Sequence, residues 1–175
     1  MKKNIIMILL LFVISISLTG CFEQRKQFKI KTKEYTIIIN AISKNNYTLS
    51  TKIEDLRSSR EEGMLFGKDF SIGIDISNEL SYEEYNNDFN KLKNVYKKEK
   101  EFKEVTYSGI KGFQLYNITF ISYQIYLPVK NDKSKVLILS VYSKANLDEA
   151  TKEIYNRKEI KDILNNVKII KNKEK

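Results

Sequence analysis

The sequence predicts an α+β domain in which helices pack on a mostly antiparallel sheet. Three observations favour this class. Several segments alternate apolar and polar residues with the period of a β-strand, and turn-forming clusters rather than helices join most of them. One long apolar stripe with helical spacing begins near Ser81. No linker divides residues 28–171, so we expect a single domain there, followed by a charged tail at 172–175.

The first half of the domain is expected to be mainly strand. Within residues 28–33, Phe28, Ile30 and Thr32 alternate with lysines. The β-branched run that follows up to Ile42 is typical of a buried strand. Residues 43–47 form a turn cluster. Residues 53–62 are compatible with either a short helix or part of a strand pair. Residues 63–76 end in a clear period of two, which indicates a strand.

The clearest helix begins at Ser81. This serine stands three residues before Glu84, which is the spacing of a capping box. Acidic residues at its start and lysines toward its end suit the helix dipole. The apolar stripe, which we expect to face the core, consists of Tyr82, Tyr85, Phe89, Leu92 and Tyr96.

The second half is expected to hold further strands, then two short helices and a last strand. Residues 113–127 form either one bent strand or two, and Pro128 should end this region before a polar turn at 129–135. The remaining expected elements are strands at 102–107, 136–142 and 167–170, and helices that start at Asn146 with Glu149 and at Asn156 with Glu159.

The N-terminus has the pattern of an export signal. Residues 5–18 carry no charge and follow Lys2 and Lys3. This run is shorter than the about 20 apolar residues that a membrane-spanning helix needs, and it suits the apolar region of a signal peptide. The residues directly after it resemble the lipobox of bacterial lipoproteins, at Leu18, Thr19, Gly20 and Cys21.

This resemblance covers residues 1–21. It implies that residues 1–20 are a signal peptide, that Cys21 carries the lipid, and that residues 21–27 tether the domain to the extracytoplasmic face of the cell membrane. The alternative is an uncleaved anchor helix with an incidental cysteine. Because an alkylated sulfur is neither a nucleophile nor a metal ligand, Cys21 would then have no chemistry of its own.

The order of the expected elements resembles the PsbP-like family of α/β sandwiches. The order is an early pair of strands, a helix, a strand meander, and then late helices with an edge strand, over residues 28–170. The resemblance implies a non-catalytic accessory or assembly role. No motif carries it, so it transfers no functional residue to this chain.

The composition argues against most enzyme classes. The chain has no His and only Cys21, which excludes His-based triads and dyads, His-ligated metals and an intrachain disulfide. Its glycines lack the context of a phosphate-binding loop. We therefore predict no enzyme activity, no cofactor and no metal site. Paired carboxylates still leave a small hydrolase as a minor alternative, and the adjacent acids are Glu61 with Glu62, Glu83 with Glu84, and Asp148 with Glu149.

The charge and the tyrosines suggest possible partners. Removal of residues 1–20 would lower the formal charge from +9 to +7. We expect an accessory module that binds an unknown envelope protein, with an anionic polymer or a phospholipid surface as the alternative ligand, and no nucleic acid. If helices leave one sheet face uncovered, Tyr116, Phe120 and Tyr126 would form an interaction surface. Strand alternation places Tyr116 and Tyr126 on one face and Tyr123 on the other.

Overall fold

The computed structural model describes residues 24–52, 57, 61–77, 81–87, 102–130 and 132–172. Several expected features lie outside the described residues: the signal peptide, the lipobox with Cys21, most of residues 53–60, the helix positions Phe89, Leu92 and Tyr96, and the tail from residue 173.

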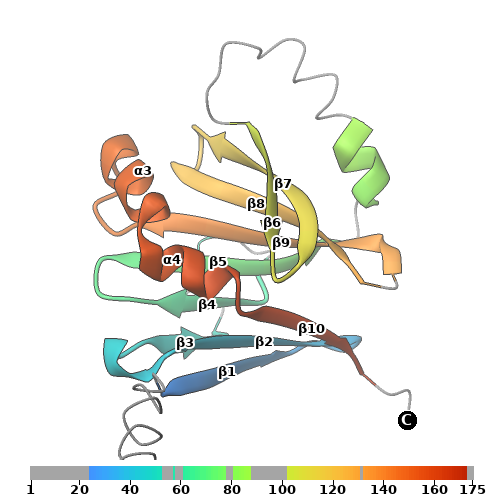
Figure 1. Ribbon diagram of the computed structural model, residues 1–175, viewed down its shortest axis with the longest axis horizontal. Helices are drawn as coiled ribbons and strands as arrows, with labels where there is room; N and C mark the ends of the chain where they lie inside the picture. The colour runs from blue at the N-terminus through green and yellow to red at the C-terminus, as the bar shows by residue number, and fades with distance from the viewer. Residues whose placement is uncertain are drawn as a thin grey trace, which may run out of the picture.

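The described residues form two antiparallel sheets (Figure 1). The larger sheet has the strand order β3-β4-β5-β9-β8-β7-β6, and all neighbouring strands in it are antiparallel. The expected class, mostly antiparallel sheet with helices packed on it, is confirmed. The strands of the larger sheet are β3 (Thr48–Ser50), β4 (Gly63–Phe66), β5 (Phe70–Ser77), β6 (Lys103–Tyr107), β7 (Ile110–Asn117), β8 (Ser122–Val129) and β9 (Asp132–Ser143).

The smaller sheet joins the two ends of the described chain. It consists of β1 (Arg25–Lys31), β2 (Tyr35–Ile42) and β10 (Val167–Lys171), in the order β1-β2-β10. The strand β10 is antiparallel to β2, with Val167 opposite Ile39. The central strand β2 therefore gains its second neighbour only when β10, the last described element, is in place.

The two sheets and two helices enclose one apolar core. The helices are α3 (Asp148–Asn156) and α4 (Lys158–Leu164); α3 packs on β8 and β9, and α4 contacts β2. Every second residue of β2, from Tyr35 to Ala41, is buried. We call the face of the larger sheet that carries Ile72, Ile74 and Leu139 its inner face, because these side chains belong to the shared core. Figure 1 shows α3 and α4 on one side of this core and the smaller sheet at its base.

The opposite, outer face of the larger sheet carries a second aromatic cluster. Phe113 of β7 stacks on Tyr126 of β8, with ring centroids 4.9 Å apart. Residues 82–87 are helical and cover this cluster through Tyr82 and Tyr85, whose ring centroids lie 5.7 Å from Phe113 and 5.2 Å from Tyr126. The start of the predicted amphipathic helix is thus confirmed as a core-facing element.

The predicted capping box is also confirmed. The Ser81 backbone N–H and hydroxyl both donate to the Glu84 carboxylate at 2.7 Å, and the Glu84 N–H donates back to the Ser81 hydroxyl at 3.2 Å. These bonds lower the pKa of Glu84 because they stabilise its ionised form.

Of the two alternatives for residues 113–127, the structure shows two strands, a hairpin of β7 and β8 with its turn at residues 118–121. Two other expectations about the second half need correction. Pro128 does not end the strand, because β8 continues through Val129; the proline sits where the register with β9 shifts. The polar turn is also shorter than predicted, since β9 already begins at Asp132.

The two late helices and the last strand are confirmed, but the predicted caps are not. Leu147 is the N-cap of α3 and Arg157 is the N-cap of α4, and neither side chain caps its helix. Instead, Asn146 adopts a left-handed backbone conformation before α3, and the Asn156 side chain donates to the carbonyl oxygen of Lys152. Both helices carry acidic residues in the first turn, and these negative charges stabilise the helix N-terminus through the helix dipole where no side chain caps it.

Candidate functional site

A groove runs along the outer edge of β10, at the boundary between the two sheets. In Figure 1, β10 runs beneath the hairpin formed by β6 and β7. The groove has a volume of about 1030 Å³, at the upper end of the range for small-molecule pockets. Its lining consists of Ser108, Gly109, Ile110 and Lys111 from the hairpin, Pro128 and Lys130 from the end of β8, and Asn165 with residues 167–170 from the α4–β10 segment.

Among the described residues β10 is an edge strand, and half of its backbone groups point away from β2 toward this groove. The Asn40 N–H donates to the Asn166 carbonyl at 3.1 Å, and the Asn172 N–H donates to the Glu34 carbonyl at 2.8 Å. In an antiparallel pair, residues that exchange hydrogen bonds with the partner strand alternate with residues that do not. Residues 166, 168, 170 and 172 therefore point their backbone groups at β2. It follows that Val167, Ile169 and Lys171 direct their N–H and C=O groups to the open edge.

The groove is apolar at its base and positively charged at its rim. Val167 is buried, and Ile169 is packed against the core, whereas Ile170 is 52% exposed. Lys111, Lys130 and Lys168 are exposed lining residues, and the lining contains no Asp or Glu. Such a groove attracts an acidic ligand at its rim and offers apolar contact below.

The hairpin that forms the far wall of the groove is held by the helices. The Ser108 hydroxyl donates to the carbonyl oxygen of Leu164 at 3.3 Å, which ties the hairpin turn to the end of α4. Behind it, the hydroxyl groups of Tyr107 and Tyr155 lie 2.9 Å apart, and the Tyr155 hydroxyl also donates to the side-chain oxygen of Gln114. The wall is therefore fixed by buried hydrogen bonds and is formed before any ligand binds.

A half-buried lysine belongs to this wall. The Lys161 ammonium group lies 3.0 Å from the ring centroid of Tyr155 and donates to the Tyr107 hydroxyl at 3.2 Å. Burial, together with the positive charge of Lys103, lowers the pKa of Lys161 to about 8. Burial also raises the pKa of Tyr107 and of Tyr155, so neither hydroxyl ionises near neutral pH. The Lys161 ammonium group already contacts the Tyr107 hydroxyl and the Tyr155 ring, so we interpret it as a structural group that stabilises the groove wall.

The structure separates the three residues of the predicted interaction surface. Tyr116 lies on the inner face opposite Tyr123, and its hydroxyl donates to Asp148 of α3 at 2.7 Å. Tyr126 lies on the outer face opposite Phe113 and is only 8% exposed. Phe120 is in the β7–β8 turn and is 54% exposed. The prediction that Tyr116 and Tyr126 share a face is wrong, because the turn at 118–121 reverses the chain between them.

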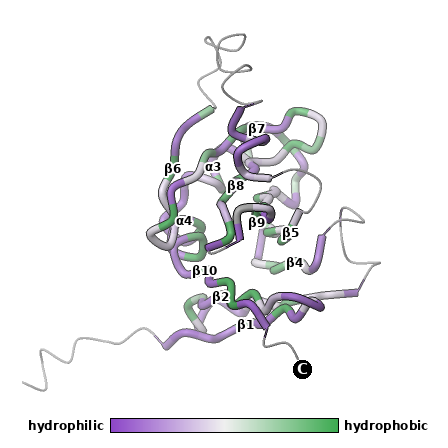
Figure 2. Tube along the Cα trace, turned by 90° about the vertical axis from the view of Figure 1, so that its right-hand side faces the viewer, coloured by the Kyte–Doolittle hydropathy of each residue, from purple (hydrophilic) through white to green (hydrophobic). Residues whose placement is uncertain are grey.

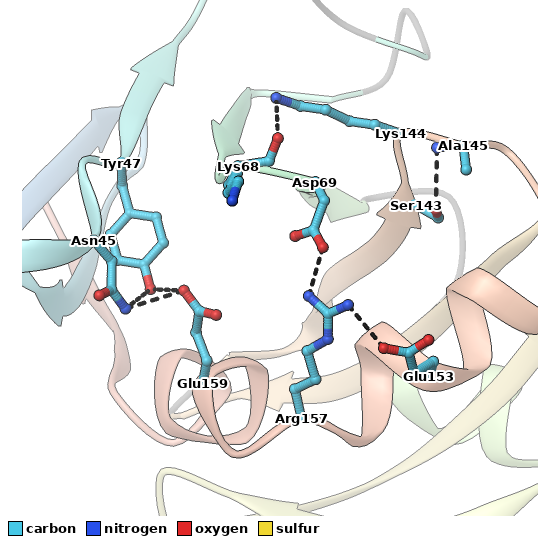
Figure 3. A network of polar contacts seen from close by, with 10 residues as sticks. All are labelled: Asn45, Tyr47, Lys68, Asp69, Ser143, Lys144, Ala145, Glu153, Arg157 and Glu159. Carbon is cyan, nitrogen blue, oxygen red and sulfur yellow. Dashed lines mark hydrogen bonds and ion pairs between the residues drawn. The ribbon is translucent and has the colours of Figure 1, made fainter.

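A polar cluster joins the helices to the strand turns at one end of the fold (Figure 3). The Arg157 guanidinium, between α3 and α4, donates to Asp69 at 2.6 Å and to Glu153 at 2.9 Å. These bonds raise the pKa of Arg157. Both carboxylates are therefore directed at one cation, and the cluster ties the β4–β5 turn to the helices.

The other residues of this cluster are also hydrogen-bonded to one another. The Tyr47 hydroxyl donates to the Glu159 carboxylate, and the Asn45 amide donates to the same carboxylate at 3.0 Å (Figure 3). Burial and the hydrogen bond to Glu159 raise the pKa of Tyr47. Since each acid in Figure 3 already accepts from a neighbouring side chain, we interpret the cluster as structural.

The predicted acid pair at Glu61 and Glu62 is split between core and solvent. Glu61 is 8% exposed and accepts from the Tyr142 hydroxyl at 3.1 Å and from the Arg57 N–H at 2.8 Å, whereas Glu62 is exposed. The Arg57 guanidinium lies 4.8 Å from the ring centroid of Tyr142. The two carboxylates are therefore in different environments and do not face one another.

The part of the chain that the structure describes holds neither a cluster of metal-binding side chains nor a membrane-spanning helix. That part contains no group of three or more His, Cys, Asp or Glu side chains that could hold a metal ion. None of the helices in the same ranges is long and apolar enough to cross a bilayer.

The groove residues were missed by reasoning from the sequence. Lys111, Lys130 and Lys168 are far apart in the chain and each looks like an ordinary surface lysine. The one available signal was the alternation in residues 167–171, which predicts an edge strand with lysines on it. The position of that edge beside the β6–β7 hairpin depends on long-range pairing.

Comparison of the chain with protein-family models, with curated proteins and with solved structures gave no match.

Proposed function

We propose that this protein is a membrane-anchored lipoprotein of the extracytoplasmic face, and that it acts as a non-enzymatic module that holds an extended, acidic segment of an envelope protein. One observation carries the proposal: the open edge of β10 faces a groove with three lysines at its rim and no acidic lining residue. An extended segment would add to β10 as a further antiparallel strand.

The dimensions of the groove favour a peptide over a small molecule. β10 has five residues, so its edge is about 17 Å long. Val167, Ile169 and Lys171 would supply the backbone hydrogen bonds, while Lys111 and Lys130 lie opposite at the rim. Main-chain pairing would give affinity, and the lysines would give a preference for Asp or Glu in the bound segment.

The anchoring part of the proposal rests on the lipobox at residues 18–21. Arg25, the first residue of β1, comes four residues after Cys21, so the folded domain would lie within about 14 Å of the lipid. A PsbP-like arrangement belongs to the same proposal. It is supported by the order of an early hairpin, a strand meander and a late helix pair before an edge strand.

The test is photo-crosslinking in intact cells. A photoreactive residue at Ile110, on the groove wall, should give a discrete crosslinked protein, and the same residue at Lys68, in the β4–β5 turn, should not. Charge reversal by Lys111→Glu with Lys130→Glu should reduce the crosslinked product by about tenfold, since two charge-assisted contacts are lost. The matched control is Lys52→Glu with Lys68→Glu, which reverses two exposed lysines outside the groove.

Equal products from the two labelled positions, or an unchanged product in the groove charge-reversal variant, would contradict the peptide-binding proposal. A Cys21→Ala variant separates the two parts, because its loss from the membrane fraction tests the anchor alone. A tightly bound cofactor in the purified protein would overturn the non-enzymatic assignment.

A further inference from the structure

The outward face of the smaller sheet is a second surface, which meets the groove along β10 and shares Lys168 and Ile170 with its lining. In the strand register, buried residues alternate with residues that point away from the core. We call this surface the basal face. Arg25, Gln27, Thr36 and Asn40 lie on it, and the residues that concern us are Lys29, Lys31, Ile38, Ile42, Lys168 and Ile170. Figure 1 shows the smaller sheet as the base of the molecule, and Figure 2 shows β1 and β2 as the layer at its edge, with purple and green residues interspersed.

The charge of the basal face has one sign. Its three strands contain no Asp or Glu. Lys29, Lys31 and Lys168 are exposed, and within the described residues they form no ion pair. Arg25, by contrast, is bound to Asp162 by two hydrogen bonds of 2.8 Å, so its charge is already compensated.

Apolar side chains lie between these lysines. Ile38 is opposite Lys29 on one side and Lys168 on the other, so the three form a row across the sheet. Adjacent strands are about 4.8 Å apart, which places the two lysine backbones about 10 Å from one another. Ile170 and Thr36 continue the surface beside Lys31. Lysines that flank isoleucines can lay their stems on apolar surface and extend their amines to anionic groups.

We propose that the basal face docks on an anionic phospholipid bilayer, so that the domain rests on the membrane in a fixed orientation. Charge complementarity favours this occupant, because Arg25 is paired with Asp162 and the charges of the face that form no ion pair within the described residues are all those of lysines. The start of the described chain favours it as well, since Arg25, only four residues after Cys21, begins β1 within the smaller sheet itself. The isoleucines favour a bilayer over a wall polymer, because a hydrated polyanion offers nothing apolar to them.

This inference shares the N-terminal anchor with the proposed function and does not depend on the groove. With the face on the membrane, the open edge of β10 would run parallel to the bilayer. A bound segment would then be held lengthwise beside the membrane surface.

The test measures the reactivity of individual lysines in the full, membrane-extracted protein. The protein is placed in nanodiscs of phosphatidylcholine alone or of phosphatidylcholine with phosphatidylglycerol, and amine acylation is followed by mass spectrometry. We expect Lys29 and Lys31 to react about fivefold more slowly in the anionic nanodiscs. Lys52 and Lys68, exposed on other elements, are internal controls that should react at the same rate in both. The protection should vanish in about 1 M salt, where charges are screened within about 3 Å.

Three outcomes would overturn the inference: equal acylation of Lys29 and Lys31 in the two lipids, protection that persists in high salt, or protection produced by soluble polyphosphate and not by the anionic lipid. The last would identify a polyanion site. Recovery of the protein in the soluble fraction would instead contradict the anchor of the proposed function. Charge reversal by Lys29→Glu with Lys31→Glu should abolish the difference between the lipids, and Lys52→Glu with Lys68→Glu should preserve it. Circular dichroism establishes that each variant is folded.

Discussion

Gly112 of β7 lies where two strands approach too closely for any larger residue. A β-carbon there would be 2.1 Å from the backbone carbonyl oxygen of Tyr126 and 2.7 Å from a methyl group of Leu127. The carbonyl oxygen belongs to the neighbouring strand and cannot move without displacing the ladder. Gly112→Ala should therefore lower the free energy of unfolding by about 2–3 kcal/mol, measured by urea denaturation.

Gly109 is the matched control for that measurement. It has a φ of +73°, and a β-carbon at this position would meet no atom within 4 Å, so Gly109→Ala should cost only backbone strain, about 1 kcal/mol. A loss at Gly112 no larger than at Gly109 would show that the hairpin can relax around the added methyl group.

Lys161 should make stability depend on pH in an unusual direction. Its pKa is about 8 in the folded protein and near 10.5 when unfolded, so between these values the unfolded chain binds more protons. The free energy of unfolding should then rise as the pH increases from 8 to 9.5. Above pH 10 the trend should reverse, because Tyr107 and Tyr155 have raised pKa values in the folded state and ionise more easily when unfolded.

Lys161→Met removes the titrating group and keeps most of the side-chain volume. This variant should lose the rise between pH 8 and 9.5, and at pH 7 it should be at least as stable as the parent, because the parent keeps a partly buried amine charged there. Lys158→Met, on the exposed first turn of α4, should retain the rise. A rise of equal size in the Lys161 variant would assign the pH dependence to other groups.

At the scale of elements, the α3–α4 pair is tied to the larger sheet through Arg157. Because the Arg157 and Asp69 side chains are 34% and 47% exposed, Arg157→Ala should cost only about 1 kcal/mol in low salt. The loss should shrink in about 1 M salt, where the parent's own ion pairs are screened. Thermal unfolding of both proteins at the two salt concentrations measures this. A loss that does not change with salt would indicate packing of the arginine stem instead.

Elements with a strong local pattern could be predicted from the sequence, and those with unusual turns could not. The strand ending at Ile76 has a regular period of two, Ser81 has cap chemistry, and the last strand at 167–170 is a short run rich in β-branched residues. The β7–β8 turn at 118–121 contains neither Gly nor Pro, and Ile121 adopts a φ of +47°, which a β-branched residue rarely does. The remaining signal is Asn117, whose side-chain oxygen accepts the Phe120 N–H at 3.1 Å.

At the scale of the whole molecule, the sequence predicted the class but not the division into two sheets. The smaller sheet depends on pairing between β2 and β10, and no local pattern specifies which distant strand completes a given edge. Both proposed surfaces depend on that pairing. The groove needs β10 beside the β6–β7 hairpin, and the basal face needs Lys168 in register with Ile38. These residues could be recognised as strand residues beforehand, but not as neighbours.

The smaller sheet combines strands from the two ends of the described chain, because β1 and β10 both pair with β2. If the protein is exported with its N-terminus leading, the β1–β2 hairpin reaches the far side of the membrane first. One edge of β2 then stays unpaired until β10 has crossed the membrane as well. Ile37 and Ile39 gain their final cover only when residues 160–169 arrive. In an exported chain, folding would therefore be coupled to complete translocation. A truncated chain that lacks β10 would expose this apolar strand to surface proteases. Proteolysis would therefore distinguish truncated chains from complete ones.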